Sequence, residues 1–316
     1  MSASPDPSLA RQVRMAQLID RLAPDEGYTL CALPGLRFMR ANRSVPRTPV
    51  LYEPSIVVVC SGRKRGYVGG RVYHYNAQQF LVLSVPLPFE GETDASEAEP
   101  MLAMSIPIDL QVAAEIAMEL DMAGVRIAEA PLGIMSSPLD ERFGNTLLRL
   151  LEALLSPVEA RLLGPGILRE ILYCVMTGSQ GGALRAALAH RSQFGKISKA
   201  LLRIHRDYTK SIDVATLAQE AGMSLAAFHA SFKAVTLTSP IQYLKTTRLH
   251  KARLLMAQSG LNAATASSRV GYESSSQFSR EFKRYFGRTP LEEARQMRSL
   301  LTQAPGASES PFVSAQ

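Results

Sequence analysis

The sequence has few of the residues that build disulfide frameworks, metal sites or active sites. Its three cysteines, Cys31, Cys60 and Cys174, are odd in number and widely spaced, so they form neither a disulfide framework nor a CxxC metal pair. The histidines follow no metal-ligand spacing, and the sequence lacks a GxSxG elbow, a P-loop and a GxGxxG stretch after a strand. We therefore expect no catalytic residue, no bound metal and no cofactor.

Long hydrophobic runs are also missing. No stretch approaches transmembrane length, and residues 1–8 lack the apolar segment of a signal peptide. These absences predict a cytoplasmic protein without a membrane partner. The length of 316 residues and the hydrophobic content of 46% suffice for two domains with real cores.

Positive charge concentrates in the C-terminal third of the chain. Residues 196–303 contain 17 Lys plus Arg and 7 Asp plus Glu, a net charge of +10, whereas the remaining residues carry a net −3. A basic helical region of this kind favours nucleic acid over a membrane surface. Binding to DNA should therefore weaken steeply with salt.

Residues 262–290 are typical of a helix, a tight turn and a second helix. Apolar residues recur at helical spacing from Ala263 to Val270, and Gly271 marks the turn. Ser274 can cap the second helix, whose buried stripe is Phe278, Phe282, Tyr285 and Phe286. Its other face is either an ordinary solvated surface or a DNA-binding surface with these contacts: Ser274, Ser275, Ser276, Gln277, Ser279, Arg280, Lys283 and Arg284.

A second copy of this plan lies upstream and favours the DNA-binding alternative. A short helix over 214–221 is followed by a turn at Gly222 and by a helix over 225–236 with Phe228 and Phe232 inward. Serine caps this helix too. Its outward residues are less charged, and the candidate contacts are Ser224, Ala226, Ala227, His229, Ala230 and Lys233.

Residues 195–292 resemble the paired helix-turn-helix domain of the AraC/XylS family of bacterial transcription regulators. The carriers of the resemblance include Gly222-Met223-Ser224, Ser239-Pro240, Val270-Gly271-Tyr272 and the run from Ser276 to Arg280. The resemblance implies binding to double-stranded promoter DNA, with RNA polymerase as a partner if the protein is an activator.

A helix over 240–258 is predicted between the two units, with Ser239 as its cap and Pro240 at its first position. At 1.5 Å per residue this rod is roughly 28 Å long, close to the roughly 34 Å between major grooves one turn apart. Its cations form either a solvated face or phosphate contacts, for which the candidates are Lys245, Arg248 and Lys251.

The N-terminal half contains a helix over 9–22 and then short apolar stretches divided by Pro and Gly. We expect strands over 28–32, 36–40, 55–60, 65–68, 72–75, 79–84 and 101–106. Gly69-Gly70 predicts a hairpin, since both residues accept positive φ. Strands without intervening helices suggest a sandwich or small barrel.

This half resembles the N-terminal domain of AraC-type regulators, a cupin-like jelly roll. The carriers are Pro54-Ser55-Ile56, Gly62 to Arg65, Gly69 to Tyr73 and Pro86 to Gly91. The resemblance implies a domain that senses a small-molecule effector and also forms dimers.

Two hypotheses concern the signal site, each with a plainer alternative. Arg63, Lys64, Arg65 and Arg71 either bind an anionic ligand or form a charged strand edge that discourages aggregation. Cys60 is either a reactive thiol with a pKa lowered by these cations or a core residue.

Helices are expected again after residue 108, over 109–122, 139–155 and 166–177, with an additional strand over 132–135. Their long apolar stripes serve packing on the sheet or a homodimer seam, and we prefer the dimer. The expected divisions are an arm and helix over 1–26, the sensor and dimerisation domain over 27–180, a linker over 181–194, the DNA-binding domain over 195–302 and a disordered tail over 303–316.

The whole pattern predicts an α+β protein. An N-terminal cupin-like jelly roll with flanking helices precedes an all-α domain with two helix-turn-helix units joined by a long helix. The predicted function is sequence-specific regulation of transcription under the control of a small-molecule signal. The alternatives are a cupin-type metal enzyme fused to a DNA-binding tail and a non-specific architectural DNA binder.

Overall fold

The computed structural model describes residues 7–125, 133–178, 181–188 and 193–302. Its helices are α1 (Pro7–Leu22), α2 (Leu110–Met122), α3 (Glu141–Ala153), α4 (Pro157–Thr177), α5 (Gly181–Leu188), α6 (Gln193–Asp207), α7 (Val214–Glu220), α8 (Leu225–Thr236), α9 (Pro240–Gln258), α10 (Ala263–Arg269), α11 (Ser275–Phe286) and α12 (Pro290–Thr302). Its strands are β1 (Gly27–Leu30), β2 (Arg37–Ala41), β3 (Val45–Tyr52), β4 (Ser55–Ser61), β5 (Arg63–Val68), β6 (Arg71–Asn76), β7 (Gln79–Leu83), β8 (Leu87–Asp94), β9 (Met101–Pro107) and β10 (Ile134–Pro138).

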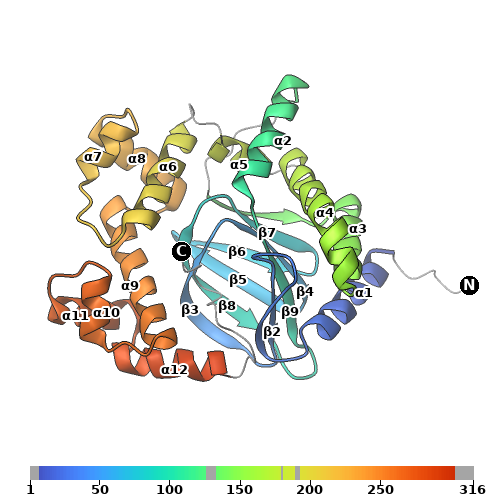
Figure 1. Cartoon of the computed structure of the whole chain (residues 1–316), viewed down its shortest axis with the longest axis horizontal. Helices are drawn as coiled ribbons and strands as arrows, with labels where there is room; N and C mark the ends of the chain where they lie inside the picture. The colour runs from blue at the N-terminus through green and yellow to red at the C-terminus, as the bar shows by residue number, and fades with distance from the viewer. Residues whose placement is uncertain (1–6, 126–132, 179–180, 189–192, 303–316) are drawn as a thin grey trace, which may run out of the picture.

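The strands form one antiparallel sheet that curls into a half-barrel (Figure 1). The strand order is β1-β2-β9-β4-β7-β6-β5-β8-β3, and β10 pairs with β7 outside this path. Gly69 and Gly70 both have positive φ, at 55° and 79°, and join β5 to β6 in the predicted hairpin. The expectation of a cupin-like β-rich domain is confirmed.

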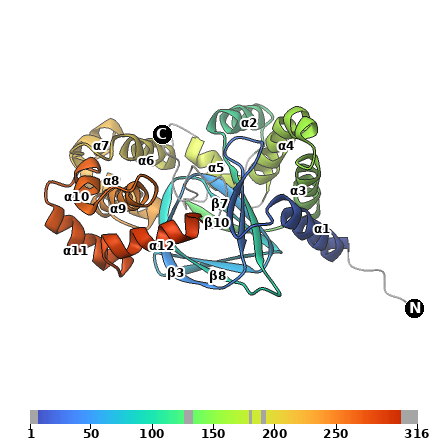
Figure 2. The same ribbon diagram turned by 60° about the horizontal axis from the view of Figure 1, so that its bottom comes forward.

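Successive side chains along each strand point to opposite faces of the sheet, and both faces have apolar residues. On β4, Ile56, Val58 and Cys60 belong to the core beneath the helices, while Val57 and Val59 belong to the core inside the curl. Helices α1 to α4 cover the first core (Figure 2). The second core is closed by the curl itself and by a leucine from the C-terminal domain, Leu237.

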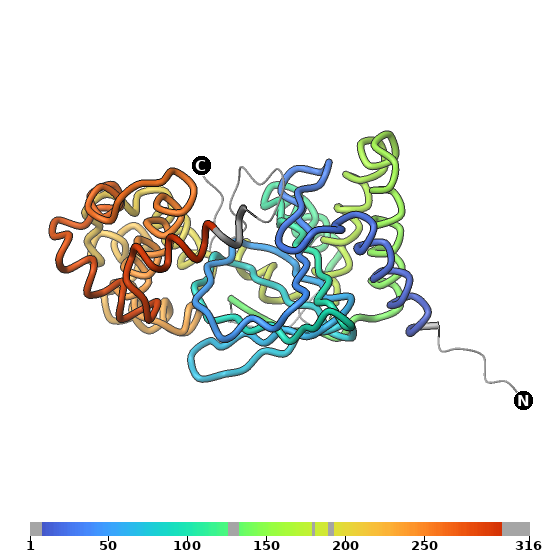
Figure 3. The backbone as a smooth tube through the Cα atoms, turned by 90° about the horizontal axis from the view of Figure 1, so that it is seen from below, coloured from blue at the N-terminus to red at the C-terminus, as the bar shows by residue number. Residues whose placement is uncertain are grey.

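Helices α6 to α12 form a lobe on the side of the sheet opposite to α1, α3 and α4 (Figure 3). Two small aromatic cores hold this lobe together, one around Phe228 and Phe232 and the other around Phe278 and Phe282. Helix α9 serves both cores, because Tyr243 near its start packs in the first and Leu249 near its middle packs in the second.

Two strands, β3 and β8, were not predicted, because prolines interrupt their apolar pattern. Proline cannot donate a ladder hydrogen bond and is tolerated at sheet edges. Strand β3 ends the strand order and pairs only with β8, and Pro49 and Leu51 still keep register with Glu90 and Pro88. The prolines of β3 therefore lie on an edge strand of the sheet.

Helix α4 begins at Pro157, nine residues before the predicted start at residue 166, and contains Pro165. The predicted linker over 181–194 contains α5, whose Leu184 joins the core beneath the helices while Ala186 and Ala187 join the first core of the C-terminal lobe. Helix α5 is thus packed against both domains. The tail over 303–316 and Leu132 of the predicted strand over 132–135 lie outside the described residues.

A buried charge joins the two domains. Arg253 of α9 is 1% exposed, and its Nη1 donates to the Pro49 carbonyl of β3 at 3.2 Å and to Glu293 Oε1 at 3.3 Å. Its guanidinium also lies 4.7 Å from the ring centroid of Phe286. Because buried charges need paired and hydrogen-bonded partners, this arrangement holds β3 against α9, α11 and α12. Arg253 is thus buried and does not belong to the solvated face or the phosphate contacts expected of the cations of α9.

We predict that Arg253→Ala lowers the free energy of unfolding by about 3–5 kcal/mol, because it leaves Glu293 buried without its cation. Urea unfolding followed by circular dichroism measures the loss. Arg288→Ala is the control: Arg288 also approaches Glu293, at 3.5 Å, but its side chain is 49% exposed, so its loss should stay below about 1 kcal/mol. Equal losses for the two variants would contradict the role assigned to Arg253.

Candidate nucleic-acid interface

Two helix-turn-helix units with the same construction lie in the C-terminal lobe. In the first, Asp213 caps α7 and the hydroxyl of Ser224 accepts from the Ala227 amide at the start of α8 at 3.3 Å. In the second, Asn262 caps α10 and the hydroxyl of Ser274 accepts from the Gln277 amide at 3.2 Å. These caps satisfy amides at the helix starts and fix where α8 and α11 begin.

Each second helix buries an aromatic stripe and leaves the opposite face open to solvent. Phe228 and Phe232 of α8, and Phe278 and Phe282 of α11, are completely buried. All the predicted contacts on both helices are exposed or partly exposed: Ser224, Ala226, Ala227, His229, Ala230 and Lys233 in the first unit, and Ser274, Ser275, Ser276, Gln277, Ser279, Arg280, Lys283 and Arg284 in the second. The structure therefore brings each predicted set together on one surface.

The charge of the two faces differs. The face of α11 has Arg280, Lys283 and Arg284, whereas that of α8 has Lys233 and the partly exposed His229. Short hydroxyl and amide groups lie at the start of α11, and its cations lie further along. This order suits a helix whose first turns meet base edges while its later turns meet phosphates.

The three cations predicted to contact phosphate from α9 have partners inside the lobe. Lys245 Nζ lies 2.9 Å from Glu281 Oε1, and Arg248 donates to the carbonyls of Tyr208 and Lys210 at 2.7 and 2.8 Å. The ammonium of Lys251 lies 5.7 Å from the ring centroid of Tyr208. These contacts fix α9 against α11 and against the loop that follows α6.

A buried hydrogen-bond chain that the sequence did not reveal crosses the domain boundary. The Tyr243 hydroxyl donates to the Pro86 carbonyl of the sensor at 2.7 Å, and His205 Nε2 lies 2.7 Å from the same hydroxyl. Since the hydroxyl has one proton, it accepts from His205, whose Nε2 therefore carries the hydrogen. Burial lowers the pKa of His205 to about 3, so this ring is neutral.

The candidate signal residues of the sensor do not form one site. Arg63 and Arg71 lie at opposite ends of the β5–β6 hairpin, since Arg63 pairs with Asn76 and Arg71 with Val68. Lys64 is buried on the other side of β5, and Arg65 lies within 2.9 Å of Asp94. Strand β5 lies between β6 and β8, so Arg63, Lys64 and Arg65 do not lie on an edge strand of the sheet.

Cys60 lies in the core beneath the helices and is 6% exposed. Burial raises the pKa of its thiol to about 12, opposite to the depressed value that a reactive thiolate needs. The packing alternative therefore describes its place in the structure.

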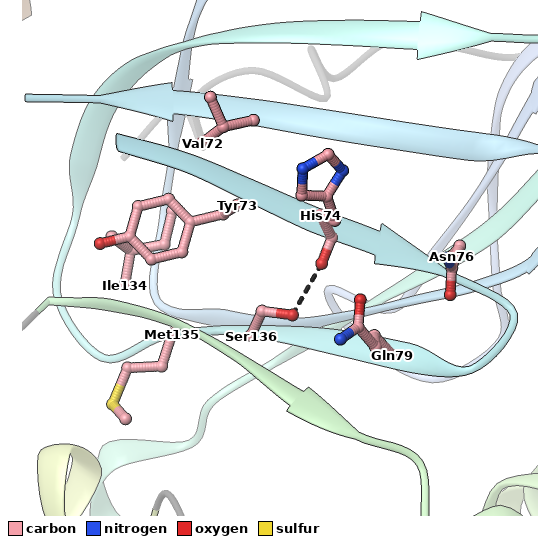
Figure 4. Close-up of a pocket in the computed structure, with 8 residues that line it drawn as sticks. All are labelled: Val72, Tyr73, His74, Asn76, Gln79, Ile134, Met135 and Ser136. Carbon is pink, nitrogen blue, oxygen red and sulfur yellow. Dashed lines mark hydrogen bonds between the residues drawn. The ribbon is translucent and has the colours of Figure 1, made fainter. Parts of the chain in front are cut away.

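Two hollows occur in the described part of the sensor. An open groove of about 610 Å³ lies between β6 and β10, where the Ser136 hydroxyl donates to the His74 carbonyl at 2.7 Å (Figure 4). A more enclosed cavity of about 90 Å³ is lined by Tyr28, Arg37, Tyr52 and Glu53 among others. Burial raises the pKa of Glu53, and the nearby charge of Lys251 on α9 opposes this shift. The second hollow thus lies close to the C-terminal lobe.

No three His, Cys, Asp or Glu side chains gather into a metal-binding group within the described residues. Among the described helices, none is both long and apolar enough to cross a membrane.

A curled β-rich domain joined to a duplicated helix-turn-helix lobe defines a two-domain regulator of the DNA-binding class. Residues 32–183 match the family described as AraC-type transcriptional regulator N-terminus, and residues 217–296 match a helix-turn-helix domain family. The chain belongs to the AraC-type transcriptional regulators.

Relatives agree with this assignment, and a solved structure has the same fold. The HTH-type transcriptional regulator AlkR of Acinetobacter baylyi is 36% identical over 95 residues, which are 30% of this chain and 31% of AlkR. The match therefore spans about a third of that relative's length. The probable thc operon regulatory protein of Rhodococcus erythropolis is 28% identical over 62% of this chain and 61% of its own length. ToxT of Vibrio cholerae has the same fold, with a TM-score of 0.57 at 12% identity over 86% of this chain and 98% of ToxT.

The neutral, buried His205 predicts a pH dependence of stability. In the unfolded chain the ring takes up a proton below its ordinary pKa of 6.5, whereas the folded ring stays neutral down to about pH 3. Stability is therefore lost as pH falls from 6.5 towards 3. Between pH 6.5 and 5, the wild-type chain should lose about 2 kcal/mol more than His205→Gln in urea unfolding. His74→Gln, at an exposed histidine of the sensor, is the control, and parallel profiles for wild type and His205→Gln would refute this expectation.

Proposed function

We propose that the protein is a sequence-specific transcription regulator that binds double-stranded promoter DNA through α8 and α11. The observation that carries this proposal is the repetition of one cap, one buried stripe and one exposed face in two units. A single amphipathic helix is common on protein surfaces, whereas two matching polar faces on one rod suit a repeated target such as the major groove.

The length of α9 supports contact with two successive grooves. Its 19 residues give a rod of roughly 28 Å, close to the roughly 34 Å between major grooves on one face of DNA. The rod is also fixed at several points, because Lys245 binds Glu281 of α11 and Arg248 binds the loop that follows α6. The two recognition helices therefore form a pre-organised pair, which lowers the ordering cost of binding.

The residues of α11 divide into two proposed roles. Ser275, Ser276, Gln277 and Arg280 lie in its first turns and contact bases or adjacent phosphates. Lys283 and Arg284 follow towards the end of the helix and contact phosphates. In the first unit, His229 and Lys233 supply the polar contacts.

We propose that a small-molecule effector controls this binding in the cytoplasm. Solved structures of ToxT include one bound to an unsaturated fatty acid and one bound to (E)-4-(8-methylnaphthalen-1-yl)but-3-enoic acid. In this chain, the cavity lined by Tyr28, Arg37 and Glu53 is the better candidate site, because it is the more enclosed of the two hollows and lies close to Lys251 of α9. The cations of the β5–β6 hairpin, Arg63, Lys64, Arg65 and Arg71, are the weaker candidates, because they are spread over both faces and both ends of the hairpin. An activating role would make RNA polymerase a further partner.

Selection of bound sequences from a random pool of double-stranded DNA at physiological salt tests the proposal. A recovered motif with two half-elements about one helical turn, or about 10 base pairs, apart supports reading by both units. Binding without enrichment would favour a non-specific architectural binder. Elemental analysis of the same preparation tests the alternative of a cupin-type metal enzyme.

We predict that Arg280→Ala and Lys283→Ala weaken DNA binding in different ways. Loss of a base contact costs about 1–3 kcal/mol, so Arg280→Ala should reduce affinity for the selected motif by roughly tenfold or more and for random DNA far less. Lys283→Ala should weaken both DNAs alike and reduce the salt slope by about one. Fluorescence anisotropy over a salt series measures both. Equal losses on both DNAs for Arg280→Ala would overturn its assignment to bases.

We also propose a homodimer through α4. Its outer surface exposes Val158, Leu162 and Leu163 at 54%, 71% and 53%, and Leu155 just before the helix adds a further 39% exposed side chain. A patch of this kind on one helix marks an interaction site. A Cβ at Gly166 on the same helix would meet no atom within 4 Å, so a partner helix can approach closely there. A second copy presents the same patch, which suits a two-fold interface.

Leu162→Glu should convert the dimer into a monomer, because it places two charges in the apolar seam. Light scattering coupled to size-exclusion chromatography measures the mass. Leu202→Glu is the matched control, since Leu202 lies on α6 and is also exposed, at 43%. A monomeric wild-type chain, or a dimer that survives Leu162→Glu, would contradict this interface.

A further inference from the structure

One difference between the two helix-turn-helix units stands out at the ends of α8 and α11. Both helices end in a residue of left-handed backbone conformation whose amide donates to the carbonyl of a lysine, Lys233 or Lys283, at 2.8 Å. In the second unit this residue is Gly287, with φ 75°. In the first unit it is Leu237, with φ 59°, and Leu237 has the only positive φ of a non-glycine residue among the described ones.

A leucine in this conformation is strained, because its Cβ crowds the backbone, whereas glycine adopts it freely. Such strain persists only where the surroundings hold it in place, and it tends to occur at functional sites. The second unit shows that the same turn forms with glycine. The leucine must therefore contribute through contacts that the turn itself does not need.

Those contacts lie in the sensor. Leu237 packs against the core inside the half-barrel, as do the partly buried Tyr28 and Tyr73 of the sensor. Its Cβ lies so close to Gly69, at the tip of the β5–β6 hairpin, that a Cβ added to Gly69 would be only 2.8 Å away. The absence of a side chain at Gly69 thus leaves the space that the Leu237 side chain occupies.

Neighbouring contacts extend the same junction. The Gly133 amide, just before β10, donates to the Val235 carbonyl of α8 at 3.2 Å. Val235 and Val85 of the sensor share one core, and a Cβ at Gly133 would lie 2.6 Å from Val85 and 3.0 Å from the Val235 carbonyl. The end of the first recognition helix is therefore held by the β5–β6 hairpin and by the segment before β10.

We propose that Leu237 and Gly69 form an interdomain latch that transmits the state of the sensor to the first recognition helix. The latch leaves the DNA-facing residues of α8 exposed and fixes the position of that helix relative to the sensor. A signal that moves the β5–β6 hairpin then moves α8, while α11 has no matching contact at Gly287, whose added Cβ would meet no atom within 4 Å. The DNA part of this inference rests on the proposed function.

A double-mutant cycle on the full chain tests the latch, with hydrogen exchange of the Gly133 amide as the first reading. Leu237→Gly removes the side chain and should speed this exchange by about tenfold, since the Gly133 bond depends on the docked helix. Gly69→Ala should do the same, because its Cβ cannot share the space with Leu237. In the Leu237→Gly background, Gly69→Ala should speed exchange of the Gly133 amide by less than a further factor of about two. The strain of alanine at the hairpin is common to both backgrounds and cancels.

Gly287→Leu is the matched control. It introduces the same left-handed leucine at the equivalent position of the second unit, where no sensor residue receives it. It should lower thermal stability without changing exchange at Gly133. Unchanged exchange in Leu237→Gly, or effects of Leu237→Gly and Gly69→Ala that simply multiply, would overturn the latch and leave Leu237 as an ordinary strained cap.

The second reading is the dissociation constant for DNA recovered by selection. Gly69→Ala should change it by at least about threefold in the wild-type background and by less than about twofold in the Leu237→Gly background. If hydrogen exchange supports the latch but the dissociation constants do not change in this way, the latch does not control DNA binding. If the selection yields no motif, the proposed function fails, and the exchange cycle still decides whether the latch exists.

Discussion

The two-faced apolar sheet is the constraint on which the rest of this structure depends. Each strand such as β4 sends alternate side chains into different cores, so neither face can be left to water without a large loss of hydrophobic stabilisation. Helices α1 to α4 cover one face. Curling buries most of the other, and Leu237 of the DNA-binding lobe packs on it. The core of the β-rich domain is therefore completed by a residue of the C-terminal lobe.

Polar groups at the junction of the domains make the contact specific. Arg253 and Tyr243 each place a donor on a backbone carbonyl of the sensor, those of Pro49 and Pro86, in surroundings from which water is excluded. In such surroundings a hydrogen bond is strong when formed, and a missing one is costly. The junction thus favours a few discrete arrangements over a continuous range. This is the property that a switch between signal states requires.

How far the sequence predicted the structure depended on how local the signals were. The bounds of α8 and α9 were predicted correctly, because serine caps, Pro240 and the spacing of apolar residues lie within each segment. Strands β3 and β8 were missed because prolines interrupt their apolar pattern, and only the assembled sheet shows that β3 is an edge strand, where its prolines are tolerated. The burial of Arg253 could not be predicted, since its partner Pro49 is 204 residues away. Leu237 could have been recognised by aligning the two units, where it replaces Gly287.

The comparison of the two helix-turn-helix units also indicates that they have different roles. The second has a glycine at its cap and three cations on its exposed face, so it is built for phosphate attraction and free of the strain seen in the first. The first has one lysine, a partly exposed histidine and a strained leucine directed at the sensor. A duplicated motif whose copies had equal roles would have no reason to keep this asymmetry. We infer that the second unit supplies most of the electrostatic affinity, while the first gives up part of it and makes the reading of DNA depend on the sensor.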